Sequence, residues 1–371
     1  MKRKNIITTV ILIVCILAAG AAAYMIWERA PETAAEKHAA AEPSPAPAAA
    51  SEVPEPTPSP TPVLDNGVPP ETDREDGIYT ILLVGEDQCT GHTDTILVGR
   101  VDTKAHKMDF VSIPRDTLLN MDGDMRKINC VCMKAKQLER DPAEALKMRV
   151  KQLIGFDVDC YAIMQLQSFI DVIDAVGGVD YYVPVDMYID DYWQNLYLYL
   201  PQGQYHLDGY QCMGLVRYRS GYANADLGRI DMQHDFLKAC AEQFITLGNI
   251  PNAPKVVDIL AKGLDTDLTA ANIAFFIRQA LLCDSDDINF YTMPVVGCTL
   301  GEGYSYAVIQ LYDWVDMINE YLNPFNTEIT SGNLSVVYKD IFGYGCTAEM
   351  AGPWYFVGAK EYEMQQAGLL P

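Results

Sequence analysis

Histidine and basic residues are scarce in this 371-residue chain. It has 5 histidines, and its 27 lysines and arginines face 50 acidic residues, for a formal net charge of −23. That charge argues against non-specific binding to nucleic acid or to an anionic membrane surface. The sequence also has no Walker-type phosphate loop and no Ser-His-Asp order, and it places no obvious nucleophile near His92, His206 or His234. A nucleotide-driven enzyme and a triad hydrolase are therefore not expected.

Metal-binding cysteine pairs are missing as well. None of the 10 cysteines belongs to a C-x-x-C pair with a matching partner pair, so we expect no structural zinc site. Cys15 lies in an apolar run, which leaves an odd number of cysteines after it. Cys160, Cys240 and Cys283 fall in periodic apolar segments and are expected to be core thiols. One or two disulfides remain open at this point.

An uncharged stretch follows Lys2, Arg3 and Lys4 and runs from residue 5 to residue 27. Roughly 20 apolar residues are what a bilayer-spanning helix needs. Basic residues before the run and Glu28 after it predict a cytoplasmic tail over 1–5 and a transmembrane anchor over 6–27, with the remainder outside the cell. The alternative is a cleaved signal peptide with a cleavage site near Ala21-Ala22-Ala23, which also exports the remainder.

Residues 28–76 are mostly Ala, Pro, Glu, Ser and Thr, with few large apolar side chains. Such a segment cannot bury enough surface to fold, and we predict an extended spacer that holds the domain away from the membrane. From 77 to 325, short β-rich runs alternate with helical patterns. This alternation predicts an α/β fold, a layered α-β-α domain with a central mixed β-sheet, preceded by one transmembrane helix. Residues 326–371 are irregular and are expected to form a C-terminal extension.

Individual elements can be predicted inside this domain. We expect strands at 79–84, 95–99 and 108–113, and a helix at 143–154 that begins after Asp141-Pro142 and ends before Gly155. Residues 188–199 are dense in aromatics and contain no basic residue. They are expected to form an edge hairpin or a lid.

Acids and bases gather where the predicted strands end. Asp87 and Asp94 flank the tight loop between the first two strands, and carboxylates are the ligands that Mg²⁺ prefers. A turn cap and a surface ion pair are the alternative for these acids. Arg115 and Asp116 follow the third strand, and Lys127 comes after a polar loop. An arginine in this position can bind phosphate bidentately, or it can form a structural ion pair with an acid.

A second group of arginines lies further along the chain. Arg217, Arg219 and Arg229 alternate with Tyr and Gly rather than with Lys and Glu, which indicates a pocket rather than a solvated face. Asp226 precedes Arg229, which we expect to open a helix whose backbone N–H groups favour an anion. Four arginines and two acids of the magnesium-binding type suit a pyrophosphate, because the metal and the guanidinium groups stabilise charge on the leaving group.

Eight motifs follow one another in a defined order between about residues 78 and 323. They are Ile81-Leu82-Leu83-Val84-Gly85-x-Asp87, Thr93-Asp94-Thr95, Ser112-Ile113-Pro114-Arg115-Asp116-Thr117, Lys127-Ile128-Asn129, Asp174-Ala175-Val176-Gly177-Gly178-Val179, Leu207-Asp208-Gly209, Arg217-Tyr218-Arg219 and Asp226-x-Gly228-Arg229-x-x-x-Gln233. In this order and spacing the chain resembles the LytR–CpsA–Psr family. The N-terminal anchor fits that resemblance.

The resemblance implies a membrane-anchored transferase of a Gram-positive-type cell surface. Such an enzyme moves a glycopolymer (teichoic acid, capsule or a related glycan) from a polyprenyl-pyrophosphate carrier to peptidoglycan. It further implies an apolar interior that takes the polyprenyl tail. No nucleic-acid partner is expected, because the net charge is strongly negative. The implied magnesium ligands are Asp87 and Asp94, and the implied pyrophosphate ligands are Arg115, Lys127, Arg217, Arg219, Arg229 and Gln233. The residues expected to act in catalysis are Arg115, Asp116, Asp226 and Arg229.

Several points stay open at this stage. Asp116 and Asp226 are both candidates to orient or deprotonate the acceptor hydroxyl. The family pattern has an arginine at the positions of His92 and Met232, so both differences remove positive charge near the pyrophosphate. Two other functions therefore remain: a non-catalytic polyprenyl-phosphate-binding protein that regulates wall assembly, and a pyrophosphatase acting on the same lipid.

Overall fold

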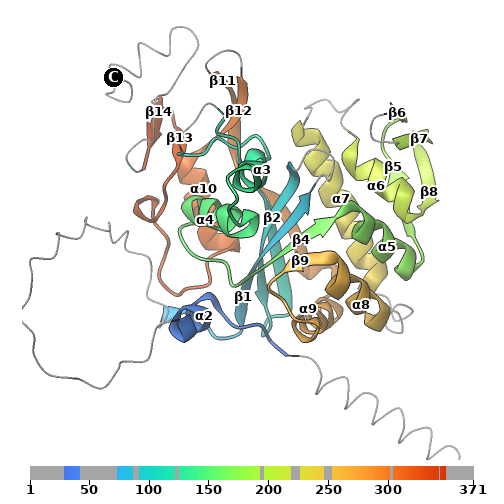
Figure 1. Ribbon diagram of the computed structural model, residues 1–371, viewed down its shortest axis with the longest axis horizontal. Coiled ribbons are helices and arrows are strands. Elements are labelled where there is room, and N and C mark those ends of the chain that lie inside the picture. Colours follow the sequence, from blue (N-terminus) through green and yellow to red (C-terminus); the bar gives the residue numbers. More distant parts are fainter. Residues whose placement is uncertain are drawn as a thin grey trace, which may run out of the picture.

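The computed structural model describes residues 29–41, 73–86, 92–121, 125–192, 196–218, 226–245, 253–300, 304–341 and 343–347 (Figure 1). The predicted tail over 1–5 and the predicted anchor over 6–27 lie outside these ranges. Within them, no helix is long and apolar enough to cross a bilayer.

A six-stranded sheet forms the centre of the domain, in the order β10-β3-β2-β1-β4-β9. β1 pairs with β4 and β3 with β10 in parallel, and the other neighbours are antiparallel. The prediction of a central mixed sheet is therefore confirmed. The strands are β1 (Ile78–Glu86), β2 (Thr93–Asp102), β3 (Lys107–Ser112), β4 (Cys160–Gln165), β9 (Leu264–Thr266) and β10 (Ile288–Thr292).

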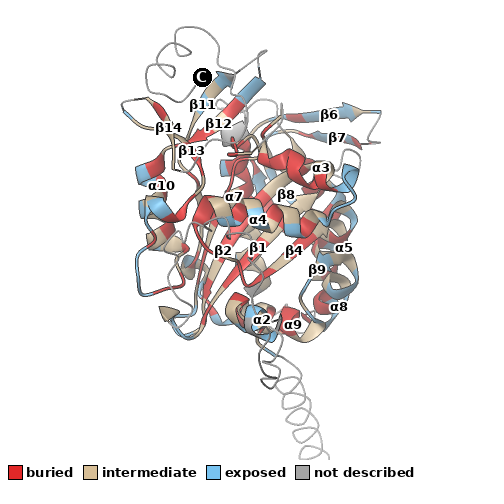
Figure 2. Ribbon diagram, turned by 60° about the vertical axis from the view of Figure 1, so that its left-hand side comes forward, coloured by how far each residue is buried: buried red, intermediate tan, exposed pale blue. Residues whose placement is uncertain are grey.

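These strands give the sheet two poles. The site pole is the end with Glu86 of β1, Thr93 of β2 and Ser112 of β3, and the base pole is the opposite end, with Ile78, Asp102 and Lys107. Figures 1 and 2 place α2 and α9 at the base pole, and α3, β6 and β7 at the site pole. β1 and β3 both run antiparallel to β2 and hence in the same direction as each other, so they end at the edge where β2 begins.

One face of the sheet carries the main core. Leu82, Val98 and Val111 are opposite one another across three strands, and they pack with α4 (Pro142–Ile154) and α10 (Leu311–Tyr321). Figure 2 shows α4 lying across this face. The Asp141 side chain caps α4, and Gly155 ends it in the left-handed conformation, as predicted.

Helices also cover the opposite face, where Tyr79, Leu83 and Phe110 point because side chains alternate along a strand. Figure 1 shows helices on this side of the sheet. They are α5 (Leu166–Val176), α7 (Asp226–Ile245), α8 (Ala253–Gly263) and α9 (Ala270–Leu282).

A small lobe and a second sheet complete the domain. The lobe contains α6 (Gly209–Arg217), the pair β5 (Val179–Val183) and β8 (Gly203–Leu207), and the hairpin β6 (Met187–Asp191) and β7 (Leu196–Leu200). This hairpin is the predicted one. The second sheet has the order β11-β12-β13-β14, with β11 (Val295–Leu300), β12 (Tyr304–Ile309), β13 (Val337–Lys339) and β14 (Tyr344–Cys346). Residues 337–346 therefore continue a sheet that starts before the predicted boundary at 325.

The structure differs from the expected spacer over 28–76 in both of its described parts, 29–41 and 73–76, since Arg74 also pairs with the buried Asp159 carboxylate. Residues 34–41 form the helix α2 (Ala34–Ala41), and Ala34 is buried against the domain. Its backbone N–H donates to the buried Asp159 carboxylate at 2.7 Å. The segment folds because it packs against the core of the domain and donates to a buried acceptor there. Its own composition could not indicate these contacts. Residues 42–72 of the expected spacer lie outside the described ranges.

Candidate functional site

Asp94 occupies an irregular position at the site pole. The ladder between β1 and β2 pairs Gly85 with Thr95 and then Glu86 with Thr93, so Asp94 is the extra residue of a β-bulge. A bulge bends its strand and re-aims a side chain, and bulges are common beside active sites. Asp94 thus leaves the regular alternation of the sheet at the point where β2 begins.

Two arginines from distant parts of the chain meet at Asp94. The Arg115 Nη1 atom donates to the Asp94 carboxylate at 2.8 Å, and the Arg229 Nη2 atom donates to the Asp94 carbonyl at 3.4 Å. Arg229 is 1% exposed, whereas the side chains of Arg115 and Asp94 are 17% and 22% exposed. The structure therefore brings together three of the predicted site residues, one of them buried and two of them partly exposed to solvent.

Arg115 and Asp116 sit in a tight turn that follows β3. The turn is closed by the Thr117 N–H and hydroxyl, which donate to the Pro114 carbonyl at 2.9 and 2.6 Å. The Asn129 N–H in turn donates to the Arg115 carbonyl at 3.1 Å. The motif around residue 115 and the motif around residue 129 thus hold each other in place.

Lys127 and Asp116 form a second ion pair beside the first. The Lys127 ammonium donates to the Asp116 carboxylate at 2.9 Å and lies 5.6 Å from the centre of the Tyr306 ring. The Tyr306 ring supports the ammonium by a cation–π contact. Sequence reasoning did not identify Tyr306, because it comes from β12 of the second sheet.

Arg217 and Gln233 lie on neighbouring helices. The Gln233 Nε2 atom donates to the Val216 carbonyl at 2.7 Å, at the end of α6 where Arg217 stands. The described contact thus gives Gln233 a positioning part, fixing the end of α6 against α7. It does not test the predicted binding of pyrophosphate by Gln233. α7 begins at Asp226, so Arg229 is inside the first turn rather than at its start.

Three predicted site residues fall on parts of the chain that the structure does not describe. They are Asp87, Arg219 and the side chain of Asp226. The predicted magnesium site is consequently seen from one side only, through Asp94. Among the described residues, no group of three or more His, Cys, Asp or Glu side chains could hold a metal ion.

The chemistry of Asp94 is nonetheless compatible with a magnesium ion. Arg115 binds its Oδ1 atom, and a carboxylate has a second oxygen and further lone pairs. Mg²⁺ usually keeps several waters and takes only one or two carboxylates together with phosphate oxygens. Glu86 and Thr93 are paired across β1 and β2. The two predicted ligands, Asp87 and Asp94, each follow one member of this pair in the sequence.

One statement from the sequence is wrong: His234 does lie beside a hydroxyl group. Its Nε2 atom is 2.7 Å from the Ser112 Oγ atom, and its ring stacks on Phe290 with centroids 5.8 Å apart. The two residues are 122 positions apart, so no local spacing could signal the contact. Burial lowers the pKa of His234. The pair joins β3 to α7 in apolar surroundings.

The two departures from the family pattern have different surroundings. Met232 is 3% exposed and belongs to the apolar core of the small lobe, with Phe236 and Leu215. His92 directly precedes β2 at the site pole. At position 232, this chain therefore has a buried apolar side chain where the family pattern has a positively charged arginine.

The expectation of core thiols is confirmed at Cys160 and Cys283, which are buried, whereas Cys240 is partly buried and packs against the apolar core of the small lobe. Cys160, Cys240 and Cys283 are free, and burial raises the pKa of Cys283 to about 11 and that of the other two further. The other free cysteines among the described residues are Cys130, Cys132, Cys212, Cys298 and Cys346.

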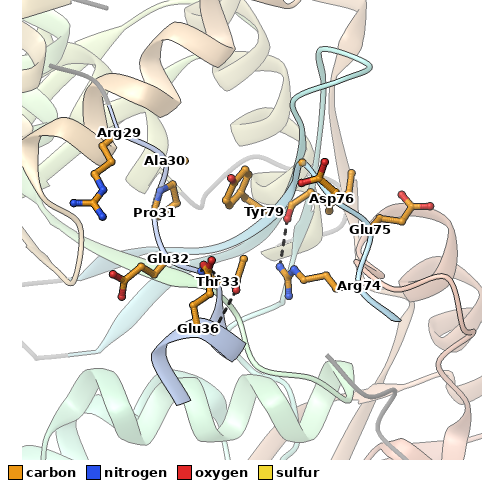
Figure 3. Close-up of a pocket in the computed structure, with 12 residues that line it drawn as sticks. Arg29, Ala30, Pro31, Glu32, Thr33, Glu36, Arg74, Glu75, Asp76 and Tyr79 are labelled. Atoms are coloured by element: carbon orange, nitrogen blue, oxygen red, sulfur yellow. Dashed lines mark hydrogen bonds between the residues drawn. The ribbon is translucent and has the colours of Figure 1, made fainter. Parts of the chain in front are cut away.

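One hollow in the described part of the domain lies away from this site. It has a volume of about 390 Å³ and lies at the base pole, between the segment 29–36 and residues 74–79 (Figure 3). We place the candidate site at the site pole regardless, because the motif residues converge there and none of them lines this hollow.

Comparison with known proteins gives a consistent result. The family model described as the LytR_cpsA_psr family matches residues 32–321. The chain is 27% identical over 263 residues to the polyisoprenyl-teichoic acid–peptidoglycan teichoic acid transferase TagU of Oceanobacillus iheyensis, covering 69% of this chain and 77% of that protein. It is 29% identical over 200 residues to the similarly named transferase TagV of Bacillus subtilis, covering 51% of this chain and 50% of TagV, half its length.

Solved structures show the same fold. The crystal structure of B. subtilis TagV matches with a TM-score of 0.53 at 24% identity, covering 63% of this chain and 91% of that one. A structure of TagT bound to LI-WTA matches with a TM-score of 0.52 at 17% identity, covering 71% of this chain and 93% of that one. At these identities the structural matches speak for the fold alone.

Proposed function

This chain belongs to the LytR–CpsA–Psr family, and from that membership and the site geometry we propose that it is a glycopolymer–peptidoglycan transferase anchored at the outer face of the cell membrane. The donor would be a glycan carried on a polyprenyl pyrophosphate. The observation that carries the proposal is the meeting of Asp94, Arg115 and Arg229 at the site pole.

The Arg115 side chain is suited to bind an anion reversibly. It is 17% exposed and bound to an acid that is itself 22% exposed, so a phosphate oxygen can replace the Asp94 carboxylate as its acceptor. Guanidinium groups bind phosphate bidentately. Arg229 is buried and held at the Asp94 carbonyl, so its charge is fixed at the same place before any ligand arrives. Preorganised charge of this kind stabilises the charge that develops on a leaving group.

Asp94 and Asp87 would hold Mg²⁺ in this proposal. The ion would neutralise part of the pyrophosphate charge, as divalent metals do in phosphoryl transfer. When the donor takes over Arg115, the Asp94 carboxylate that Arg115 holds in its absence would be available to the metal.

The reaction is a transfer of the glycan phosphate to a hydroxyl of peptidoglycan. The acceptor oxygen forms a bond to the phosphorus that carries the glycan, the bond from that phosphorus to the bridging oxygen breaks, and polyprenyl phosphate leaves. The proton of the acceptor hydroxyl passes to a carboxylate. Asp116, held by Lys127 at 2.9 Å, and Asp226 are both candidates for this base, and the choice between them stays open.

The hydrocarbon chain of the donor would lie between the sheet and the helices α7 and α9. Leu83, Phe110 and Phe290 face this layer and remain only half-buried although helices cover them. Their remaining apolar surface is what a prenyl chain would cover. On the opposite face Leu82, Val98 and Val111 are sealed by α4 and α10.

A non-catalytic lipid-binding protein is the second candidate. It is favoured by Met232, where the family pattern has an arginine and this chain buries a thioether in an apolar core. Loss of one positive charge would weaken stabilisation of the leaving group more than binding of the lipid, because the prenyl chain contributes apolar contacts of its own.

The test follows the products made by the full chain in neutral vesicles. The vesicles would hold a polyprenyl-pyrophosphate-linked glycan and receive a peptidoglycan oligomer, with Mg²⁺ or with EDTA. We expect glycan on the oligomer in the presence of Mg²⁺, none with EDTA, and none with the Asp94→Ala variant.

Each other outcome identifies one of the alternatives. Release of a glycan phosphate in water, without glycan on any oligomer, would support a pyrophosphatase. Lipid that binds without chemical change, with every oligomer tried, would support the binding protein and contradict the transferase.

A further inference from the structure

The segment of residues 29–41, here called the arm, is attached to the base pole from its first described residue. The Arg29 N–H donates to the Ala271 carbonyl at 3.1 Å, and the Asn272 side chain donates to the Arg29 carbonyl at 2.8 Å. Both partners lie in the first turn of α9. Pro31, two residues later, is buried. The arm therefore contacts the domain from its first described residue onward.

A buried acid then holds the arm to the sheet. The Asp159 side chain is completely buried, and it accepts from the Ala34 N–H at 2.7 Å and from the Thr80 N–H at 2.7 Å. Arg74 completes the set with an ion pair to the same carboxylate. On the outside, the Lys37 ammonium binds Asp267 at 2.6 Å. Hydrogen bonds to a buried charged group are among the stronger ones in proteins.

The attachment lies very close to the predicted anchor. The apolar run ends at Trp27, two residues before Arg29. Two residues of extended chain span at most about 7 Å. The pole to which the arm is attached can therefore not stand away from a membrane that holds residues 6–27. This step rests on the anchor of the proposed function.

From this we infer that the base pole, with the arm and the first turn of α9, is a docking surface for the lipid bilayer. The site pole then points away from the membrane. The nine residues of β1 run from one pole to the other, and at about 3.3 Å per residue they set the site roughly 30 Å from the membrane surface.

The surface chemistry of the base pole sets the depth at which it meets the lipid. Figure 3 shows its hollow bordered by Arg29 and Arg74 and by the acids Glu32, Glu36 and Glu75. Charged side chains are costly in hydrocarbon, so this pole lies among the headgroups without entering the membrane core. Acids outnumber bases there, so the short covalent connection, not attraction to anionic lipid, keeps the pole in place.

The arrangement also changes the part played by residues 42–72. Arg74, which follows this segment, and Ala34, in the helix that precedes it, contact the same Asp159 carboxylate at the base pole. The described residues on both sides of the segment are therefore attached to the base pole. The length of the segment does not set the distance between the membrane and the domain, contrary to the spacer that its composition suggests.

The donor lipid gains a route from this orientation. At the base pole, Tyr79 of β1 packs against Phe275 and Phe276 of α9, with ring centroids 5.4 and 6.4 Å apart, and all three remain half-buried. They belong to the same layer between sheet and helices in which we place the prenyl chain. That chain would pass from the bilayer through this layer to the site pole.

Energy transfer from dyes on the domain to dyes on the lipid headgroups tests the orientation. The full chain would be placed in neutral phosphatidylcholine vesicles and labelled through a single azido amino acid, which avoids its cysteines. One label replaces Lys104, in the turn at the base pole, and the other replaces Leu138, exposed after α3 at the site pole. We expect strong transfer from position 104 and weak transfer from position 138, for a difference in height of roughly 30 Å.

Two variants test the cause of the difference. Deletion of residues 48–63 is expected to leave both transfer efficiencies unchanged, whereas a true spacer would bring both labels closer to the membrane. Ala34→Asp places a second carboxylate beside Asp159 and is expected to release the arm and remove the difference between the labels. Ala40→Asp, on an exposed position of the same helix, is the matched control and should keep it. The difference should also survive high salt.

The proposal is overturned by equal transfer from both labels in the unaltered chain, by a deletion that moves both labels, or by a chain that does not stay with the vesicles. None of these readings depends on catalysis. A chain that shows the expected orientation but transfers no glycan would contradict the proposed transferase function and would still support the docking of the base pole on the membrane.

Discussion

The two poles of the sheet each contain an aspartate bound to an arginine, and the two pairs differ in their access to solvent. At the site pole, the side chains of Asp94 and Arg115 are 22% and 17% exposed. At the base pole, those of Asp159 and Arg74 are 0% and 7% exposed. The Asp–Arg pair at the site pole can therefore exchange a partner with solvent or a ligand, whereas the pair at the base pole cannot.

Burial explains the difference in what each pair can do. Asp159 accepts hydrogen bonds from two backbone N–H groups in addition to Arg74, so any change of partner would leave a charged group unsatisfied inside the protein. Asp94 stands on a bulge beside solvent, where a metal ion, a phosphate or water can take over a contact. An ion pair seen in a fold is thus a structural clamp or a binding site according to its surroundings.

The largest effect we expect is the loss of the base-pole pair. Asp159→Ala leaves the Arg74 guanidinium buried without its carboxylate and should cost about 3–5 kcal/mol of unfolding free energy. Urea unfolding of the full chain in detergent, followed by near-ultraviolet circular dichroism, measures it. Asp94→Ala is the control and should cost about 1 kcal/mol or less. Equal losses in the two variants would contradict the comparison.

The next effect belongs to the metal side of the site pole. Asp94→Asn keeps the shape of the side chain and removes its charge, so we expect transfer to fall roughly 10²-fold. The concentration of Mg²⁺ needed for half-maximal rate should rise. A titration of the transfer rate against Mg²⁺ concentration measures the maximal rate and the half-maximal Mg²⁺ concentration separately. A lower rate with an unchanged Mg²⁺ requirement would show that Asp94 acts through Arg115 alone.

The second ion pair at the site pole should matter less. Lys127→Met removes an ammonium that is bound to Asp116 and supported by Tyr306, and we expect transfer to fall about tenfold to a hundredfold. Initial rates over a range of donor concentrations measure this. The effect should appear at low donor concentration if Lys127 binds the ground state. A loss of equal size at low and at saturating donor would instead assign Lys127 to the reaction step.

The smallest expected effect concerns the pH dependence of stability at His234. Burial holds the pKa of this histidine below its ordinary value, so the folded protein keeps it neutral while the unfolded chain takes up a proton as the pH falls through about 6.5. The resulting stability is present above that pH and is lost below it. His234→Gln should flatten this slope, as measured by unfolding at a series of pH values. An unchanged slope would exclude His234 as its source.

Much of the central sheet could be predicted because its signals are local. The predicted runs at 79–84 and 95–99 lie within the longer strands β1 and β2, and the run at 108–113 overlaps β3 except for its last residue. The predicted helix at 143–154 is α4 without its first residue. Strand alternation and helix caps are properties of neighbouring residues, so they can be read without the fold.

The arm could not be predicted, since its stability comes from elsewhere in the chain. Ala34 depends on Asp159, which is 125 residues away, and alanines and glutamates alone indicate no docking. The contact between Ser112 and His234 could not be predicted for the same reason, because the two residues are far apart in the sequence. In contrast, Asp94, Arg115 and Arg229 could be grouped beforehand, because motif order carried the long-range information that composition lacks.

The most direct test of the central claim compares Arg115 with Arg100. Both side chains are 17% exposed and bound to acids, but Arg100 lies near the base pole, 3.5 Å from Glu75 and 3.7 Å from Asp102. The measurement is the rate of glycan transfer by the full chain in vesicles, for Arg115→Ala and for Arg100→Ala. We predict a fall of about 10²–10³-fold for the first variant and an unchanged rate for the second. Equal rates in the two variants would contradict a pyrophosphate site at the site pole.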